Sequence, residues 1–435
     1  MEATVIIIFV IGYLLIALEH PIKVNKSATA IVTGVLCWTI YALVSETPIE
    51  HILDQLAEHF GEISEILFFL LGAMTIVELV DGYEGFRIIT DRIKTKDAKK
   101  LLWIICGITF FLSAILDNLT TSIVMVSLVR KLVPNRDMRL VFVGMIVISA
   151  NAGGAWSPIG DVTTTMLWIG GQISAVNIIR TLILPSIVCM AVPLLYLQFT
   201  LKGEVGDANQ STEPAENNLH GDQTEVKGAK TMLFLGVGGL IAVPFFKTVT
   251  HLPPYVGMLL SLGIIWIVSE LMNPHLEEKE KKPYTAAGAL ARIDVASVLF
   301  FLGILLAVAA LQSMGLLHQF ASYLAQTIGD NRIIITLIGI LSSIVDNVPL
   351  VAASMGMYSL EDFPSDHMIW EYLAYCAGTG GSMLIIGSAA GVAVMGMEKI
   401  DFIWYLKKIS LLALMGYFAG AIVYLIMYPY LAVHP

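Results

Sequence analysis

Two short polar sequences interrupt long apolar runs, and each is a near copy of the other. Asp117-Asn118 lies inside the apolar run near 101–129, and Asp346-Asn347 lies inside the run near 332–358. The seven residues that end at Asn118 return as the seven that end at Asn347, at an offset of 229 residues. Because carboxylates and amides are costly in apolar surroundings, two equivalent breaks of this kind constrain the fold strongly.

Two further landmarks repeat in the same order. The tetrapeptide at 67–70 returns at 299–302, an offset of 232, and the glycine-rich segment 152–160 returns at 379–387, an offset of 227. Three landmarks whose spacing drifts by only a few residues indicate an internal duplication of about half the chain. We therefore expect two structural repeats, 1–202 and 230–435, joined by the polar segment 203–229.

The composition places both repeats in a lipid bilayer. Hydrophobic residues make up 57% of the chain, charged residues only 14%, and the mean hydropathy is +0.78. A soluble domain is therefore excluded, and the net charge of −10 argues against nucleic acid as a partner. The four cysteines are scattered through apolar runs without metal-ligand spacing, so we expect them to be packing residues.

A membrane span needs about 20 apolar residues. The first candidate follows Glu2 rather than a basic segment and lacks a small-residue cleavage site, so we interpret it as a retained span and not a signal peptide. The predicted spans lie near 4–19, 28–45, 63–83, 138–168, 178–201, 231–248, 255–272, 293–312, 369–396 and 403–428. The runs at 101–129 and 332–358 are too short for two crossings of about 20 residues each. We therefore predict that both are re-entrant hairpins.

Basic residues give the orientation, because short loops that carry Lys and Arg stay cytoplasmic. Basic residues flank both ends of the first hairpin, whereas the second hairpin is followed by acidic residues. The segment 46–62 is also acidic, so we expect both of these acidic segments to be external loops. The N-terminus is then outside, the linker 203–229 is cytoplasmic, and the two repeats are inverted. Helices at 84–96 and 316–328 are predicted to lie in the interface. The basic residues on the predicted inner side include Lys23, Lys26, Arg87, Arg92, Arg130, Lys131, Arg136, Arg139, Lys279, Lys407 and Lys408.

The polar chemistry is concentrated in the first hairpin and in the glycine-rich break of the span 138–168. Asp117 and Asp161 each cost about 2.5–3.5 kcal/mol at mid-membrane, and neither motif contains Lys or Arg. Interrupted backbone at this depth is tolerated only where it faces protein or a watery cavity, and it can offer carbonyl oxygens to a cation. Two unpaired carboxylates therefore point to a mobile cation or to protons. The alternative is a structural role, with both carboxylates held by neighbouring hydroxyls as helix caps.

The second repeat has lost part of this chemistry. Ser388 stands where Asp161 stands in the first repeat, and Leu384-Ile385 replaces Ser157-Pro158. We therefore expect one ion site, built mainly by the first repeat. Asp346 is left with an accessory, proton-carrying or structural role.

The string from Ser149 to Thr165, together with Leu116–Thr121, resembles the NhaD-type sodium/proton antiporters of the wider ion transporter superfamily. The resemblance implies exchange of Na+, and also Li+, for protons across a bacterial plasma membrane and without a cofactor. Because sodium needs a deprotonated site, we expect the ion and the proton to compete for the shared carboxylates of Asp117 and Asp161. It also implies a homodimer in which a scaffold holds a moving transport part. The residues that match the family's ion and proton site are Asp117, Asn118, Thr120, Asn151, Ser157, Asp161 and Thr163, with Asp346, Asn347 and Ser382 from the second repeat, and sodium itself is assigned to Asp117, Asn118, Asn151 and Asp161.

The expected fold is thus an all-α polytopic membrane protein of two inverted-topology repeats, each with a re-entrant hairpin and a broken transmembrane helix. Two other functions stay open. An anion carrier of the same superfamily would use neutral groups at half-helix N-termini, and carboxylates at Asp117 and Asp161 oppose it by like-charge repulsion. An intramembrane aspartyl protease could share a proton between two aspartates, but Pro158 departs from its Gly-x-Gly-Asp signature. We expect a transporter and not an enzyme.

Overall fold

The computed structural model describes residues 2–17, 19–90, 95, 97–201, 228–272, 281–344 and 346–431. Within these ranges every regular element is a helix. The predicted linker 203–229 lies outside the described residues except at its last two positions. All four cysteines are free and buried, which confirms their packing role.

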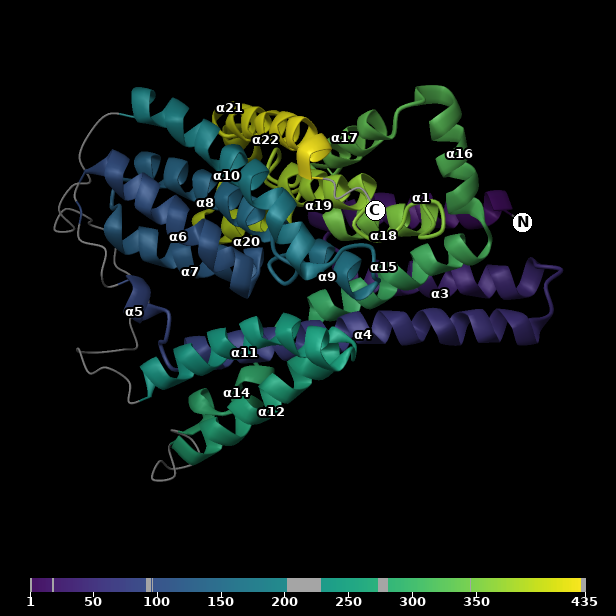
Figure 1. The fold of residues 1–435 in the computed structure, drawn as a ribbon, viewed down its shortest axis with the longest axis horizontal. Helices are drawn as coiled ribbons and strands as arrows, with labels where there is room; N and C mark the ends of the chain where they lie inside the picture. Colours follow the sequence, from purple (N-terminus) through teal and green to yellow (C-terminus); the bar gives the residue numbers. More distant parts are fainter. Residues whose placement is uncertain are drawn as a thin grey trace.

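In the part of the chain that the structure describes, the first repeat consists of ten helices, and Figure 1 shows their arrangement. They are α1 (Glu2–Ala17), α2 (Glu19–Ile22), α3 (Lys26–Val44), α4 (Ile49–Gly82), α5 (Arg87–Thr90), α6 (Ala98–Leu116), α7 (Asn118–Leu132), α8 (Arg136–Ala155), α9 (Val162–Ile169) and α10 (Ala175–Thr200).

The second repeat presents the same order, with small additional helices. They are α11 (Ala229–Thr250), α12 (Pro254–Met272), η2 (Lys282–Tyr284), α14 (Ala286–Leu290), α15 (Val295–Ser313), α16 (Leu316–Ile328), α17 (Asn331–Leu341), α18 (Asn347–Met357), α19 (Met368–Gly380), α20 (Ala389–Glu398), α21 (Phe402–Lys408) and α22 (Ser410–Leu431).

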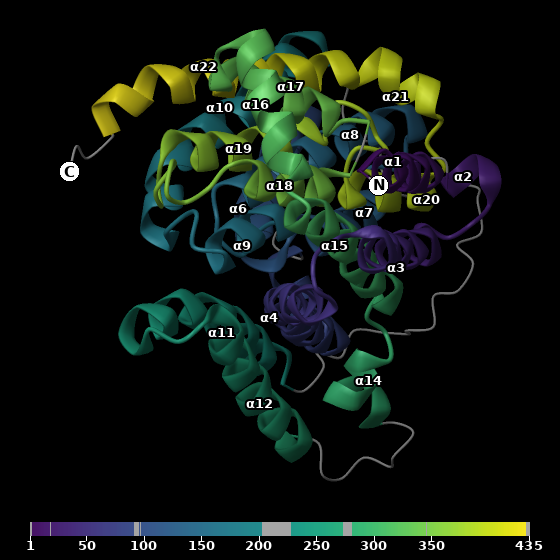
Figure 2. The same ribbon diagram turned by 90° about the vertical axis from the view of Figure 1, so that its right-hand side faces the viewer.

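The two repeats point in opposite directions. In Figure 1, α4 leads to α5 at the left end of the molecule, whereas its counterpart α15 leads to α16 at the right end. Figure 2 shows α11, α12 and α14 grouped with α4 on one side, while the hairpins and broken helices form the larger group on the other. The sequence duplication therefore appears in space as an inverted pair.

Nine helices in the described ranges are long and apolar enough to cross a membrane, namely α3, α4, α6, α8, α10, α11, α12, α15 and α22. The predicted spans 138–168 and 369–396 are both broken, into α8 with α9 and α19 with α20. The predicted first span is the 16-residue α1, which falls short of that length. Of the two helices in the first hairpin, α6 is long and apolar enough to cross a membrane by itself and α7 is not. The re-entrant course of this hairpin therefore stays a prediction.

The acidic segment 46–62 is not a separate loop. Most of it forms the first four turns of α4, a continuous helix of 34 residues that starts at Ile49. Glu50, Asp54, Glu58 and Glu62 recur every fourth residue, so they share one face while apolar residues occupy the other. The charge pattern that suggested a loop is that of an amphipathic helix extension.

The two predicted interfacial helices have different outcomes. The segment 316–328 is the helix α16, and it meets α17 at a bend of 114°. Such a bend is the geometry expected of a helix that lies across the direction of the spans. Of the segment 84–96, only Arg87–Thr90 is described as helix, and residues 91–94 and 96 lie outside the described residues.

Helices α3 and α15 join the repeats at very close range. A Cβ atom added to Gly34 would lie 2.5 Å from the carbonyl oxygen of Gly303, so the backbones touch there. Small residues allow this approach between membrane helices. The indole of Trp38 donates to the carbonyl oxygen of Leu306 at 2.9 Å, and Ser27 donates to that of Ala296 at 2.6 Å. The pair forms a close seam between the two repeats, and α15 also packs against α18 of the second hairpin.

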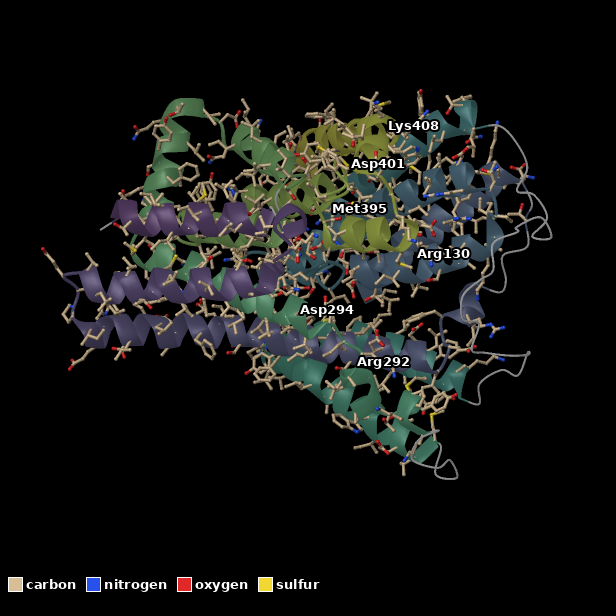
Figure 3. The ribbon with its side chains drawn as sticks, turned by 180° about the vertical axis from the view of Figure 1, so that it is seen from behind. Arg130, Arg292, Asp294, Met395, Asp401 and Lys408 are labelled. Atoms are coloured by element: carbon tan, nitrogen blue, oxygen red, sulfur yellow. The ribbon has the colours of Figure 1, made fainter. Side chains whose placement is uncertain are left out.

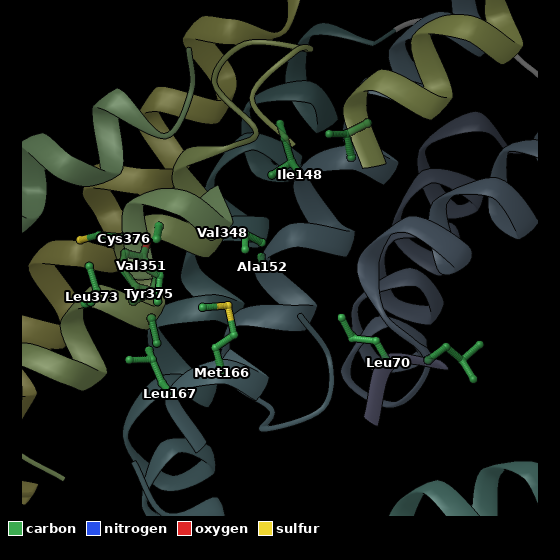
Figure 4. Packing of buried hydrophobic residues seen from close by; sticks show 14 of the residues in the cluster. Leu70, Ile148, Ala152, Met166, Leu167, Val348, Val351, Leu373, Tyr375 and Cys376 are labelled. Carbon is green, nitrogen blue, oxygen red and sulfur yellow. The ribbon is translucent and has the colours of Figure 1, made fainter. Parts of the chain in front are cut away.

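The short half-helix α9 packs into the second repeat. Figure 4 shows Met166 and Leu167 of α9 beside Val351 of α18 and Leu373 of α19. All four side chains are buried in the core of the molecule. The apolar packing of α9 thus fixes its N-terminus, which carries Asp161, against the second hairpin.

Candidate functional site

The tip of the first hairpin is a single residue. Helix α6 ends at Leu116, α7 begins at Asn118, and Asp117 between them has a φ of 106°. A non-glycine residue in that region is strained by about 1–3 kcal/mol. Its carboxylate stabilises the turn by capping α7, since it accepts hydrogen bonds from the backbone N–H and the hydroxyl of Thr120, both at 2.8 Å.

The tip rests against the break between α8 and α9. A Cβ atom added to Gly153 would lie 2.2 Å from the carbonyl oxygen of Phe110. One added to Gly160 would lie 2.7 Å from the carbonyl oxygen of Ser113. Only glycine permits such an approach of two backbones. Ser157 then donates to the carbonyl oxygen of Ala114 at 2.5 Å, which ties the break to the hairpin.

Asp161 is the point at which three elements meet. Its carboxylate caps α9 by accepting from the backbone N–H and hydroxyl of Thr163, both at 2.9 Å. The amide of Asn118 at the hairpin tip donates to it at 2.7 Å, and the amide of Asn347 from the second hairpin donates at 3.5 Å. Asp161 is 2% exposed, so the carboxylate is buried in protein.

Asn151 extends this network into the second repeat. Its oxygen accepts from Asn118 at 3.0 Å, and its nitrogen donates to Ser382 at 2.9 Å and to Ser388 at 3.0 Å. All four side chains are buried. The two hairpin tips and the two helix breaks therefore share one polar cluster in the interior of the molecule.

No cationic side chain of the described residues forms an ion pair with Asp117 or Asp161. The two carboxylates lie within electrostatic range of one another. Amides and hydroxyls hold both of them through neutral hydrogen bonds. An uncompensated pair of this kind attracts a small cation or protons.

Most of the residues predicted for the site meet in this cluster, but four do not. Asn118, Asn151, Asp161, Thr163, Asn347 and Ser382 are connected by hydrogen bonds. Asp117 and Thr120 bond each other at the tip, Ser157 bonds the hairpin backbone, and Asp346 forms an ion pair with Lys26. As the alternative predicted, Asp117 and Asp161 both cap helices, but Asp161 also accepts bonds from two other elements.

Sequence reasoning missed two residues of this region. Ser388 was identified as the counterpart of Asp161 but not as part of the site, and the duplication itself was the signal that could have included it. Lys26 was counted as a charge of an inner loop, whereas it is the first residue of α3 and its ammonium lies 3.3 Å from the Asp346 carboxylate.

The second repeat keeps the geometry of the break without its carboxylate. A Cβ atom at Gly387 would lie 2.8 Å from the Ser342 carbonyl oxygen, as one at Gly160 would lie 2.7 Å from that of Ser113 in the first repeat. Ser388 caps α20 through the N–H of Gly391 at 3.2 Å, in the place of Asp161. The hydroxyl of Ser342 donates to the Ala377 carbonyl oxygen at 2.9 Å, matching Ser113 with Ala150. The backbone scaffold of the break is repeated, and the hydroxyl of Ser388 replaces the carboxylate of Asp161.

An ion-pair cluster fixes the base of the first hairpin to the second repeat. Glu398, at the end of α20, binds Arg130 of α7 and also Arg139 of α8, the latter at 3.1 Å. Its side chain is only 3% exposed. Figure 3 shows Arg130 beside the part of α20 that carries Met395. Movement of the hairpin against α20 would have to break this cluster.

A cavity of about 440 Å³ lies at the C-terminal end of α9, between α4, α15 and α18. His59, Glu62 and Glu65 of α4 line it together with Gln172 and Gln312. His59 contacts the hydroxyl of Ser313 at 3.1 Å. The polar cluster and this cavity lie at opposite ends of α9.

Known proteins resemble the chain over nearly its whole length. A family model described as a citrate transporter matches residues 13–370. The chain is 48% identical over 424 residues to Sodium/proton antiporter 1 of Arabidopsis thaliana, which covers 98% of this chain and 72% of that protein. It is 29% identical over 455 residues to the Na(+)/H(+) antiporter NhaD of Vibrio cholerae, which covers 97% of this chain and 91% of that one.

A solved structure supports the fold. The chain superposes on the YdaH transporter of Alcanivorax borkumensis, described as having an unusual topology, with a TM-score of 0.60 over 94% of this chain and 99% of that chain. At 10% identity this likeness concerns the fold alone. It agrees with the all-helical, multi-spanning architecture predicted from the sequence.

These relatives are transporters, so the prediction that the chain is not an enzyme is confirmed and the protease alternative is excluded. The nine apolar helices and the family together make it a multi-pass membrane protein. The matched length and the identity to the plant and bacterial proteins confirm the resemblance drawn from Ser149–Thr165: the chain belongs to the citrate-transporter family and, within it, to the NhaD-type sodium/proton antiporters.

Proposed function

We propose that this chain exchanges sodium for protons across its membrane at a single ion site centred on Asp161. The observation that carries the proposal is the environment of that carboxylate. It is buried, it is reached by neutral amides and hydroxyls from α7, α9 and α18, and it has no ion-pair partner among the described residues. A buried anion in such surroundings is stabilised by a mobile cation or a proton.

The proposed sodium ligands are oxygens of Asp117, Asn118, Asn151 and Asp161, with backbone carbonyls freed at the break. In this structure the amide nitrogen of Asn118 donates to Asp161. Rotation of that amide exchanges its nitrogen and oxygen, so Asn118 can hold the cation-free carboxylate and can also ligate sodium. A proton on Asp161 removes the charge that sodium needs, which makes the two ions compete for shared carboxylates.

The finer features of this function are proposals as well. We propose that lithium is also carried, that the protein works as a homodimer, and that the two hairpins enter and return on opposite sides of the membrane. The positions of α5 and α16 at opposite ends of the molecule in Figure 1 and the basic residues that flank the first hairpin support this orientation, with the N-terminus outside. The bacterial plasma membrane stays a prediction, since the relatives come from a plant and from a bacterium.

Proteoliposomes that hold a preset pH gradient test the proposal. A sodium pulse should collapse the gradient with wild-type protein, and Asp161→Asn should abolish the response while the protein stays folded and inserted. Citrate, given in place of sodium, tests the description of the family model. Collapse by citrate with no response to sodium would replace the antiporter by an anion carrier.

A further inference from the structure

The aspartate at the tip of the second hairpin forms an ion pair with a lysine of α3. The ammonium of Lys26 lies 3.3 Å from a carboxylate oxygen of Asp346, although 320 residues separate them in the chain. The same ammonium lies over the ring of Phe300, 4.5 Å from its centroid. The two side chains are 24% and 16% exposed, so the pair is mostly removed from solvent.

Other polar groups surround this pair. The backbone N–H of Lys26 donates to the carboxylate of Glu19 at 3.0 Å. Tyr13 of α1 lies within electrostatic range of Asp346, and its buried hydroxyl has no hydrogen-bond partner in the described structure. The Asp346 carboxylate thus binds the ammonium itself, and the Glu19 carboxylate binds the backbone N–H of the same lysine.

The two hairpin tips differ in how their aspartates are satisfied. Both oxygens of Asp117 accept hydrogen bonds from Thr120. At the second tip, Pro349 stands where the offset of 229 residues places Thr120, and a proline has no donor to offer. Asp346 receives one weak capping bond, from the N–H of Val348 at 3.4 Å, and the ion pair with Lys26. Lys26 therefore supplies to Asp346 the side-chain partner that Thr120 supplies to Asp117.

The pair also lies next to the proposed sodium site. Asn347, which follows Asp346 directly, donates to Asp161 at 3.5 Å, and the charges of Asp346 and Asp161 lie within electrostatic range of one another. A change of charge at the second tip is therefore felt at the first site.

We propose that the Lys26 ammonium is a tethered cation that fills a second cation site, the one that the duplication provides at Asp346. The inference rests on the proposed sodium site at Asp161. It explains why a duplicated scaffold works with one transported cation: the second position is permanently occupied by a charge that belongs to the chain. Lys26 is then the residue that sets the number of sodium ions bound.

The variant Lys26→Gln removes the tethered charge and leaves Asp346 as an open carboxylate. This variant is expected to bind two sodium ions per chain, where the wild-type protein binds one. Adding Asp346→Asn to it should return the number to one, because both charges of the pair are then gone. Lys26→Arg keeps the charge and should bind one sodium ion.

Lys247 provides a matched control. It is also a partly buried lysine over an aromatic ring, 4.9 Å from the centroid of Trp168, and it donates to the Trp168 carbonyl oxygen at 3.0 Å. Within the described ranges it forms no ion pair with a carboxylate. Lys247→Gln should therefore bind one sodium ion, as the wild-type protein does.

The experiment is equilibrium binding of radioactive sodium to the purified full chain at alkaline pH, counted per mole of protein. In membrane vesicles the same change is read without purification, as a rise of the Hill coefficient for sodium from about 1 toward 2 in Lys26→Gln. One ion in wild type and one in Lys26→Gln, or two in Lys26→Arg, would overturn the tethered-cation proposal. No ion in the wild-type protein would instead overturn the proposed function.

Discussion

Replacing Gly160 by alanine is expected to push the first hairpin away from the break that carries Asp161. The new Cβ atom would lie 2.7 Å from the Ser113 carbonyl oxygen and 2.9 Å from the Ala114 Cα. Both are backbone atoms, so no side chain can rotate out of the way. Contacts of 3.4 Å are ordinary, which means that the two backbones must separate by about 0.7 Å.

The expected size of the effect follows from that displacement. Overpacking of a tight interior costs about 1–3 kcal/mol. Because Asn118 at the hairpin tip donates to Asp161 at 2.7 Å, this cost falls on the assembled site. A tenfold change in an equilibrium constant corresponds to about 1.4 kcal/mol. The sodium concentration at half-maximal rate, the apparent KM for sodium, should therefore rise by roughly 5- to 140-fold.

The assay is the initial rate of sodium-driven collapse of a pH gradient in proteoliposomes, measured across a range of sodium concentrations. Gly107→Ala, in α6 of the same hairpin, is the control, because nothing lies within 4 Å of a Cβ atom added there. It should keep the wild-type sodium constant and stabilise the helix by about 0.5–1 kcal/mol. A wild-type sodium constant in Gly160→Ala would refute the claim that close contact between hairpin and break builds the site.

Three other changes test separate parts of the account. Asp117→Asn and Asp161→Asn should each abolish exchange while the protein stays inserted, as measured by proteoliposome transport beside membrane yield, and full activity of Asp161→Asn would move the site elsewhere. Glu398→Gln leaves Arg130 and Arg139 without their buried carboxylate and should lower the free energy of unfolding in detergent by about 1–3 kcal/mol; an unchanged unfolding midpoint would remove this cluster as a restraint on the hairpin. Single cysteines at Asn217 and Asp362 in a cysteine-free background should label from opposite sides of the membrane, and labelling from one side would contradict the inverted orientation.

The sequence was enough to predict which segments meet at the site. Asn118, Asn151 and Asp161 are polar residues in apolar runs, and their cost in a membrane made them recognisable one at a time. The resemblance to the NhaD-type antiporters then indicated that Asn347 and Ser382 of the second repeat would join them, and hydrogen bonds link all five. Local pattern combined with the family resemblance therefore predicted most of the residues of the polar cluster.

Other features depended on contacts that no local pattern contains. The pairing of Lys26 with Asp346 spans 320 residues, and a lysine near the end of an apolar run looks the same whether it faces water or a hairpin tip. The extension of α4 to Ile49 was missed because acidic residues favour a loop by charge, although their four-residue spacing suits a helix equally well. Ser388 has no charge, so its position in an apolar run does not mark it as a site residue. Only its equivalence to Asp161 in the repeat indicates that role.

We propose that sodium and protons compete for the same buried carboxylates, and initial exchange rates against sodium concentration at several pH values test this competition most directly. In the pH range where protons occupy the site, each unit of acidification should raise the apparent sodium constant about tenfold if one proton competes, while the rate at saturating sodium changes much less. A remote histidine gate, such as His59 at the cavity beyond α9, predicts the reverse, a pH-dependent maximal rate at a constant sodium affinity. A sodium constant that does not change with pH would contradict the shared-carboxylate mechanism.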